Sequence, residues 1–273
     1  MPAFRERYDL VLLDVTKEAK GGAIDDIVEV DLSNPDVDAY RAHFEGLDAI
    51  VHNGHHWGEV RAGPPLQWLP DQEPGDVDGY YVERVNLDMA FHVLKLALEE
   101  NVRRVVITSS NHAADWYESK LHHGKMDMVA PDTYPLSDNY YGWAKATYEH
   151  LGFVFASGRF GRALETVHIR IGAPRPIIGE KFKDSPVSYR RDLGAFISAR
   201  DLAQLYVKSI ETEDIRNSDG VPFQVFYGIS NNTRAFWSLV NAREVIGYAP
   251  EDDSERLFAA DIEKYLRAPG RTF

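Results

Sequence analysis

Short β-rich runs alternate with longer helical patterns along this chain, and that alternation constrains its fold most. The runs read YDLVLLD, DDIVEVD, LDAIVHN, VRRVVITSS, ETVHIRI and VPFQVFYG, at residues 8–14, 25–31, 47–53, 102–110, 165–171 and 221–228. Between them, residues 35–44 and 82–100 carry helical patterns. Strands that alternate with crossover helices are typical of a parallel sheet. The sequence therefore predicts an α/β fold with a doubly wound, mostly parallel sheet.

The N-terminal end lacks one part of that pattern. Residues 8–13 form the first visible strand, and residues 4–7 before it resemble the last turn of a helix. In a nucleotide-binding sheet, a first strand and its glycine-rich turn precede such a helix, but no G-x-x-G-x-x-G occurs near this end. We therefore expect the first strand and its turn to be missing from the chain as written.

Composition narrows the classes of function. The chain has 273 residues, no cysteine, and 43 acidic against 30 basic residues, which give a net charge of −13 without a polybasic block. Nucleic acid and anionic membranes are therefore not expected partners, and disulfides, thiolate nucleophiles and cysteine-bound metals are excluded. No apolar run reaches the length of a membrane span, and the start MPAFRERYDL lacks the apolar core of a signal peptide. We expect a soluble, cytoplasmic protein.

Residues 57–81 form the longest stretch without a helical or strand period. They are crowded with Gly and Pro and include Trp57 and Trp68. The stretch follows the strand that ends at His52, so it leaves the carboxyl edge of the sheet, where ligands bind in open α/β folds. An ordered loop near a ligand and a surface insertion without a role are equally good interpretations.

The strongest local pattern joins a strand tip to the start of a helix. The run VRRVVITSSNH ends in Ser110, Asn111 and His112, and further along the chain Tyr141 and Lys145 open a helical segment. Tyr and Lys four residues apart share a helix face. An ammonium beside a phenol lowers the phenol pKa from near 10, towards a range in which it takes a proton from an alcohol. The pattern predicts a proton-transfer site, in which the serine hydroxyl holds the same alcohol.

The Tyr and Lys pair alone is a weak signal, because this spacing arises by chance in a chain with 14 tyrosines. An exposed tyrosine beside a solvated lysine is the alternative interpretation. The position of the pair, after a Ser-Ser strand tip and at the start of a helix, favours the catalytic one.

Several segments in order carry a family resemblance. They read VVITSSNH, YGWAK, IRIGAPRP, FISARDLA, FYGISNNTRAFWS and IGYAPEDDSE. From about residue 8 to about residue 255, the chain resembles the uronate dehydrogenases of the extended short-chain dehydrogenase/reductase superfamily, within the NAD-dependent epimerase/dehydratase group. The resemblance implies that residues 1–273 form one NAD(P)-binding, Rossmann-like domain. It also implies a small C-terminal substrate lobe, with segments at about 172–200 and 222–273.

The resemblance implies roles for the residues of the strand tip and the helix. Tyr141 would be the general base, and Lys145 would lower its pKa and donate a hydrogen bond to the nicotinamide ribose. Ser110 would orient the reacting hydroxyl. Asn111 and His112 would contact the sugar.

It also implies a ligand for a substrate carboxylate. Arg191, seven residues before Ser198 as in the family pattern, would form a bidentate pair with it, and Arg190 is a close competitor. Ala173 stands where these enzymes usually have a serine, which leaves one substrate hydrogen bond in question.

For the cofactor, the resemblance implies NAD. Asp14 ends the second strand of the usual fold, where a carboxylate accepts hydrogen bonds from the adenosine ribose and repels the 2′-phosphate of NADP. Asp31 and Leu32 resemble the adenine-side pair, and Asn86 matches an asparagine in the helix behind the site. The glycine-rich cradle that would anchor two phosphates at a helix N-terminus does not occur in the sequence.

A second departure from the family pattern lies after the strand that ends at His52. The family usually reads HLGG there, whereas this chain reads HNGHHW, so the identity of the substrate is open. Together with His122 and His123, these histidines raise the hypothesis of a metal site. No ligand recurs at a recognised spacing, so polar loop histidines are the favoured interpretation and no metal is predicted.

The resemblance thus implies an NAD-dependent oxidoreductase of carbohydrate metabolism, which oxidises a hexuronate, a small sugar acid, to its aldarolactone. A nucleotide-sugar epimerase or dehydratase is a second hypothesis, disfavoured by a short C-terminal part without an obvious basic pocket for a diphosphate. A third is a degenerate, non-catalytic binding or regulatory module. Coding DNA in frame upstream of Met1 for a strand and G-x-x-G-x-x-G would favour the enzyme. The oligomeric state is left open.

Overall fold

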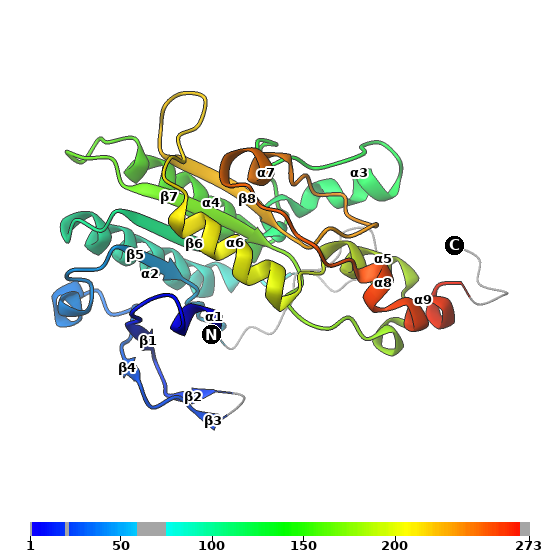
Figure 1. Cartoon of the computed structure of the whole chain (residues 1–273), viewed down its shortest axis with the longest axis horizontal. Coiled ribbons are helices and arrows are strands. Elements are labelled where there is room, and N and C mark those ends of the chain that lie inside the picture. The colour runs from blue at the N-terminus through cyan, green and yellow to red at the C-terminus, as the bar shows by residue number, and fades with distance from the viewer. Residues whose placement is uncertain (1, 20–21, 59–74, 268–273) are drawn as a thin grey trace.

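A four-stranded parallel sheet forms the centre of the molecule (Figure 1). The computed structural model describes residues 2–19, 22–58 and 75–267. The strands follow the order β5 (Ala49–His52), β6 (Arg104–Ser110), β7 (Glu165–Ile171) and β8 (Phe223–Gly228). All three strand pairs are parallel, so the four strands end at one edge of the sheet. The predicted parallel sheet is confirmed.

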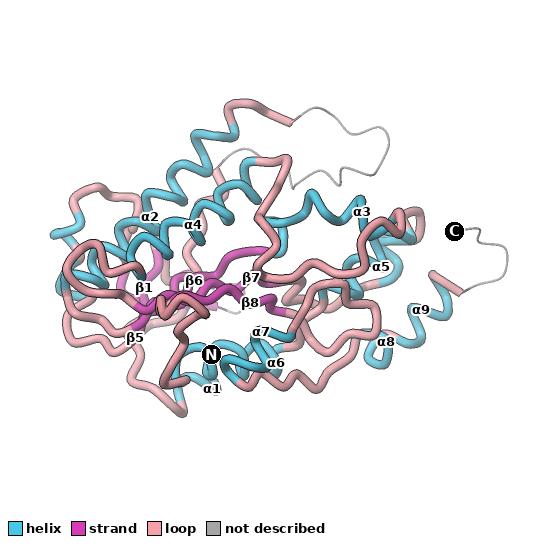
Figure 2. The backbone as a smooth tube through the Cα atoms, turned by 90° about the horizontal axis from the view of Figure 1, so that it is seen from above, coloured by secondary structure: helices cyan, strands magenta, loops and turns pink. Residues whose placement is uncertain are grey.

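The apolar runs of the sequence become strands because both of their faces are covered. Val105, Val106 and Ile107 of β6 are fully buried, as expected for a parallel strand packed between two helical layers. On one face lie α2 (Gly79–Glu99) and α4 (Tyr140–Ala156), and on the other α6 (Ala199–Glu211) and α7 (Val240–Ile246) (Figure 2). The doubly wound architecture is therefore confirmed.

Two further strands form a separate parallel pair, β1 (Leu12–Asp14) with β4 (Ile27–Glu29). A short hairpin of β2 (Glu18–Ala19) and β3 (Gly22–Ala23) lies between them in the chain. In the described part of the chain, no strand joins this pair to β5. The expectation that a strand and its glycine-rich turn precede this pair stays a prediction.

The N-terminal segment packs against α6. It begins with α1 (Pro2–Arg5), which agrees with the predicted helical turn before the first strand. The Phe4 ring meets that of Tyr206 edge to face, at 6.5 Å between ring centroids. Tyr8 donates a hydrogen bond to Glu211 at 2.8 Å, and Arg7 forms an ion pair with the same carboxylate. These contacts hold the start of the chain on the α6 side of the main sheet.

The helix predicted for residues 35–44 is wrong. Two 3₁₀ turns form instead, η1 (Val37–Ala39) and η2 (Arg41–His43), and Tyr40 between them has φ −132° and ψ 7°, outside the helical region. Asn34 accepts a hydrogen bond from the backbone N–H of Asp36 at 3.0 Å. Such local side-chain bonds compete with a regular helix.

By contrast, the helix predicted for residues 82–100 is confirmed as α2. The loop predicted at 57–81 falls largely on residues 59–74, outside the described residues.

Short helices complete the fold, mostly beyond the carboxyl ends of the strands (Figure 1). In chain order they are η3 (Asn111–Tyr117), α3 (Glu118–His122), η4 (Gly179–Phe182), α5 (Pro186–Ala195), α8 (Ser254–Leu257) and α9 (Ala259–Tyr265). The last four pack on one another, within the segments predicted as a substrate lobe. The division into a main domain and such a lobe stays a prediction.

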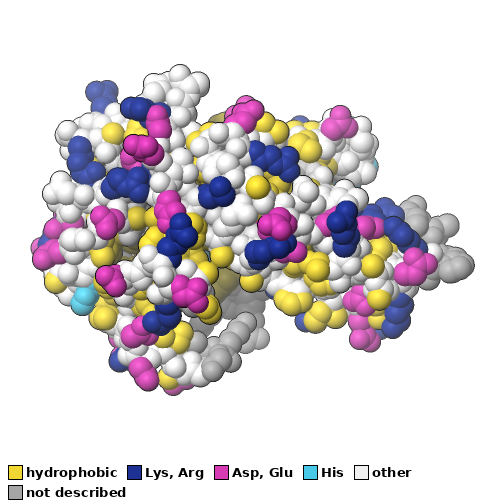
Figure 3. Space-filling model, viewed as in Figure 1, with side chains coloured by type: hydrophobic (Ala, Val, Ile, Leu, Met, Phe, Trp, Pro, Cys, Tyr) yellow, Lys and Arg dark blue, Asp and Glu magenta, His cyan; other side chains and the backbone are white. Residues whose placement is uncertain are grey.

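The surface carries both signs of charge. On the face seen in Figure 3, acidic and basic side chains are interspersed rather than separated into large patches of one sign. Among the helices of the described residues, none is both long and apolar enough to cross a membrane.

Candidate active site

Segments far apart in the sequence meet in one cleft at the carboxyl end of β6 and β7. The cleft has a volume of about 1370 Å³, above the usual range of about 300–1,000 Å³ for a single small ligand. Residues that line it include Trp57, Glu83, Ser110, Asn111, His112, Tyr141, Ala173, Arg175 and Arg191. Thus five of the predicted site residues, Ser110, Asn111, His112, Tyr141 and Arg191, lie on one cavity.

Ser110 is the last residue of β6 and lines the cleft. Its backbone is extended, and its Oγ accepts a hydrogen bond from the backbone N–H of His112 at 3.2 Å, which caps η3. Asn111 follows as the first residue of that turn, buried, with its side-chain Nδ2 lacking a partner among the described residues. A buried amide donor without a partner is costly, and an oxygen of a ligand bound in the adjacent cleft would accept its hydrogen bond.

Tyr141 lies in the first turn of α4, and a close approach of the backbone places it. Asn139 caps the helix by accepting from the N–H of Gly142 at 2.9 Å, and its amide donates to Asp115 of η3 at 2.9 Å. A Cβ on Gly142 would lie 2.2 Å from the carbonyl oxygen of His112. The glycine of YGWAK is therefore required for α4 to begin directly against η3.

The pKa of Tyr141 differs from the sequence prediction. Burial raises the pKa of the phenol, a hydrogen bond with Ser110 opposes that change, and the charge of Glu83 adds to it. The Lys145 Nζ lies 5.5 Å from the centre of the Tyr141 ring. The net direction is the opposite of the predicted lowering, because burial dominates, and the role of Lys145 beside Tyr141 stays a prediction. Tyr141 and Ser110, on whose proximity the site depends, both line the cleft.

Lys145 is a buried cation behind Tyr141. Its side chain donates to the carbonyl oxygen of Thr108 at 3.3 Å. Burial lowers the pKa of Lys145 to about 8, although the charge of Glu83 acts in the opposite direction. Burial and the charge of Lys145 also lower the pKa of His52 to about 4 and that of His55 to about 3. These two imidazoles are therefore neutral at pH 7, while Lys145 is charged.

Lys145 gives a test of this burial through the pH dependence of stability. An unfolded lysine titrates near 10.4, so between about pH 8 and pH 10 the unfolded chain retains a proton that native Lys145 has lost. The free energy of unfolding should therefore rise with pH in this window, and Lys145→Met should remove that rise. Urea unfolding of both proteins at pH 7.5, 8.5 and 9.5 measures it. Parallel pH dependences in the two proteins would contradict the assignment.

Glu83 is a site residue that the sequence prediction missed. It is 8% exposed and lines the cleft, where burial raises its pKa while Lys145 and Asn86 lower it. The amide of Asn86 donates to Glu83 at 3.2 Å, and also clamps His56 through its backbone N–H and C=O at 2.7 and 2.9 Å. The position of Glu83 one helical turn before Asn86 was the available signal.

Aromatic rings surround Tyr141. The Trp57 ring is nearly parallel to it, at an interplanar angle of 12° and a centroid separation of 6.3 Å. His55 and His112 meet the Tyr141 ring at steep angles, with centroids 5.4 and 5.7 Å away.

In the described residues, no group of three or more His, Asp or Glu side chains is placed to hold a metal ion.

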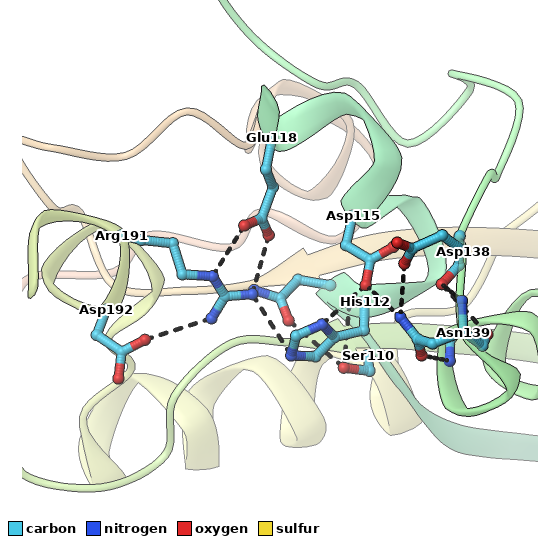
Figure 4. A network of polar contacts seen from close by, with 11 residues as sticks. Ser110, His112, Asp115, Glu118, Asp138, Asn139, Arg191 and Asp192 are labelled. Carbon is cyan, nitrogen blue, oxygen red and sulfur yellow. Dashed lines mark hydrogen bonds and ion pairs between the residues drawn. The ribbon is translucent and has the colours of Figure 1, made fainter. Parts of the chain in front are cut away.

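The predicted carboxylate ligand Arg191 already binds an acidic side chain (Figure 4). Its Nε and Nη2 donate to the two carboxylate oxygens of Glu118 at 3.0 and 2.9 Å, and Nη2 also lies 3.5 Å from Nε2 of His112. The opposite ring nitrogen of His112 contacts Asp115 at 3.1 Å. Arg190, the competitor, is not among the residues lining the cleft.

The residues predicted for the adenosine side of a dinucleotide lie apart from this cleft. Asp14 ends β1, and Asp31 comes shortly after the end of β4, so the parallel pairing of these strands brings both carboxylates to one edge. Asp31 accepts hydrogen bonds from the N–H and hydroxyl of Ser33, which lower its pKa. The carbonyl of Leu32 contacts His92 at 2.8 Å. The cofactor roles of these residues and of Asn86 stay predictions.

Two known proteins similar to this chain are named uronate dehydrogenases. No family model matches the chain. A uronate dehydrogenase from Pseudomonas syringae pv. tomato is 30% identical over 93% of this chain and 76% of its own length. A uronate dehydrogenase from Pseudomonas putida is also 30% identical, over 92% of this chain and 78% of its own.

Solved structures share the fold. A glucuronic acid dehydrogenase from Chromohalobacter salexigens matches with a TM-score of 0.68 at 22% identity, over all of this chain and 86% of that one. A mutant uronate dehydrogenase from Agrobacterium tumefaciens, complexed with NAD, matches with a TM-score of 0.65 at 23% identity, over 96% and 82% of the two chains. The Rossmann-like fold predicted from the sequence is confirmed.

Proposed function

This chain belongs to the uronate dehydrogenase family of the extended short-chain dehydrogenases, and we propose on that premise that it oxidises the anomeric carbon of a hexuronate to an aldarolactone, with NAD as hydride acceptor. The observation that supports the reaction best is that Ser110 and Tyr141 line the same cleft, while the Lys145 ammonium lies behind Tyr141, 5.5 Å from the centre of its ring. A hydroxyl at a strand tip and a phenol at a helix start thus face one cavity, as positioned proton transfer from an alcohol requires.

The proton of the anomeric hydroxyl would pass to the oxygen of Tyr141, while Ser110 holds the same hydroxyl by a hydrogen bond. Burial keeps the phenol protonated, and a protonated phenol cannot accept a second proton. We therefore propose that the rate rises with pH as Tyr141 ionises. Asn111 and His112, on the same wall of the cleft, would bind other hydroxyls of the sugar.

Residues of this chain would hold both ends of NAD. When bound, NAD supplies the acceptor for the hydride that leaves the anomeric carbon. Lys145, whose ammonium has three donors and one hydrogen bond among the described residues, would hold the nicotinamide ribose. Asp14 and Asp31 would accept hydrogen bonds from the adenosine ribose and the adenine side, with Leu32 beside them and Asn86 in the helix behind the site.

Formation of NADH by the purified chain tests the proposal. Absorbance at 340 nm, followed with NAD and either glucuronate or galacturonate, should increase with uronate concentration and saturate. UDP-glucose under the same conditions should give no NADH, as it carries no free anomeric hydroxyl. Failure with both uronates would reject the proposed reaction. Conversion of UDP-glucose to another nucleotide sugar without net NADH formation, detected by chromatography of the products, would favour an epimerase or dehydratase instead.

A further inference from the structure

We propose that Arg175, rather than Arg191, is the side chain that binds the carboxylate of the acidic sugar. This inference rests on the proposed function, because it names the group that would distinguish a uronate from a neutral sugar in the same cleft. Arg175 and Arg191 both line that cleft, so the hydrogen bonds that each already makes decide between them.

The guanidinium of Arg191 is already hydrogen-bonded to carboxylates of the protein itself. Two parallel hydrogen bonds join its guanidinium to Glu118, whose side chain is 1% exposed. Its remaining terminal nitrogen, Nη1, lies 3.4 Å from Asp192. A substrate carboxylate that took the fork of Arg191 would leave Glu118 charged, buried and without its partner, which is strongly unfavourable.

Arg175 is presented on a restrained loop. It follows β7 between Pro174 and Pro176, and both prolines restrict the backbone, one through its own φ and one through the residue before it. The loop is also anchored, because Ala173 donates to the carbonyl of Ala195 at 2.7 Å and accepts from the N–H of Ile197 at 3.2 Å. The base of the Arg175 side chain is therefore fixed before a ligand arrives.

A buried carboxylate orients Arg175 without occupying its fork. Nη2 of Arg175 donates to Asp192 at 2.7 Å, while 57% of the Arg175 side chain is exposed. A guanidinium has five N–H donors, and this is the single hydrogen bond that Arg175 makes among the described residues. The remaining donors suit a carboxylate, which pairs with arginine bidentately. Asp192 thus holds the guanidinium at the cleft with its fork available.

Binding measurements on the full chain separate the two arginines. Glucuronate and glucose are titrated into the wild type, Arg175→Ala, Arg175→Lys and Arg191→Lys, and dissociation constants are obtained from ligand-detected NMR. Hydrogen bonds to charged groups contribute enough that Arg175→Ala should weaken glucuronate binding roughly 10- to 100-fold. Glucose binding should change less than about threefold, and Arg175→Lys should lie between the two proteins for glucuronate, since it keeps the charge but loses the fork.

Arg216→Ala is the matched control. Arg216 is 62% exposed and pairs with one carboxylate, Asp214, at 2.7 Å, but it does not line the cleft. This variant should bind both sugars like the wild type. Because the proposed contact is exposed, glucuronate binding should also weaken with added salt, whereas glucose binding should not.

The outcomes separate this inference from the proposed function. A selective loss of glucuronate binding in Arg175→Ala supports the inference. An unchanged ratio of glucuronate to glucose affinity in that variant, or a selective loss in Arg191→Lys alone, overturns it, while NADH formation from uronates by the wild type would still support the reaction. A wild type that neither binds nor oxidises a uronate overturns both.

Discussion

Tyr141→Phe is expected to lower kcat for uronate oxidation about 10²- to 10⁴-fold, the range that a positioned general base contributes. The change removes one oxygen, the atom that would receive the substrate proton. The ring contacts with Trp57 and His55 remain, since they involve only the aromatic face and edges. Steady-state NADH formation with glucuronate measures the loss. Affinity for NAD, followed by equilibrium titration, should stay close to that of the wild type.

Tyr148→Phe provides the matched control on the same helix. Its hydroxyl is buried and has no hydrogen-bond partner among the described residues, and its ring, which lies 4.7 Å from the Lys145 ammonium, is kept. This variant should therefore turn over within a few-fold of the wild type. If Tyr141→Phe and Tyr148→Phe retain similar activity, Tyr141 is not the base.

Glu149→Ala is expected to destabilise the fold by about 3–5 kcal/mol, the cost of leaving a buried charge without its partner. Arg170 donates to both oxygens of Glu149 at 2.8 Å, and the two side chains are 1% and 3% exposed. Ser109 donates to the same carboxylate at 2.9 Å, and Arg170 also donates to Tyr227 at 3.0 Å. Urea unfolding followed by circular dichroism gives the change in the free energy of unfolding.

An exposed ion pair serves as the comparison. Glu251 is 65% exposed and pairs with Arg200 at 2.9 Å, so Glu251→Ala should change stability by less than about 1 kcal/mol. The double replacement Glu149→Leu with Arg170→Met should recover much of the loss, because no unpaired charge then remains. Equal effects of Glu149→Ala and Glu251→Ala would show that burial does not set the cost.

The fold and part of the site followed from local patterns. The main strands were predictable because residues such as Val105 to Ile107 must be apolar when helices cover both faces of a sheet. Parallel strands end at one edge, and the segments after β6 and β7 therefore meet there. For that reason, Ser110 and Tyr141 could be predicted to share a cavity before its shape was known, whereas Arg191 was predicted from the family resemblance alone.

The parts that could not be predicted depend on tertiary contacts. Glu118 and Arg191 are 73 residues apart, and no spacing in the sequence indicates that one neutralises the other. The raised pKa of Tyr141 depends on burial by several elements, which outweighed the single i, i+4 relation seen in the sequence. The helix predicted for residues 35–44 failed for a local reason instead: Asn34 accepts a hydrogen bond from the backbone N–H of Asp36, and two 3₁₀ turns follow.

Helix α4 carries the candidate base, its cation and the core carboxylate at intervals of four residues, as Tyr141, Lys145 and Glu149. These positions follow one stripe along the helix. A rotation of α4 that swung Tyr141 away from the cleft would also withdraw Glu149 from Arg170. The ion pair between Glu149 and Arg170, which stabilises the core, thus also fixes the orientation of the candidate base Tyr141 about the helix axis. Variants selected only for thermal robustness should therefore tend to preserve the orientation needed for turnover.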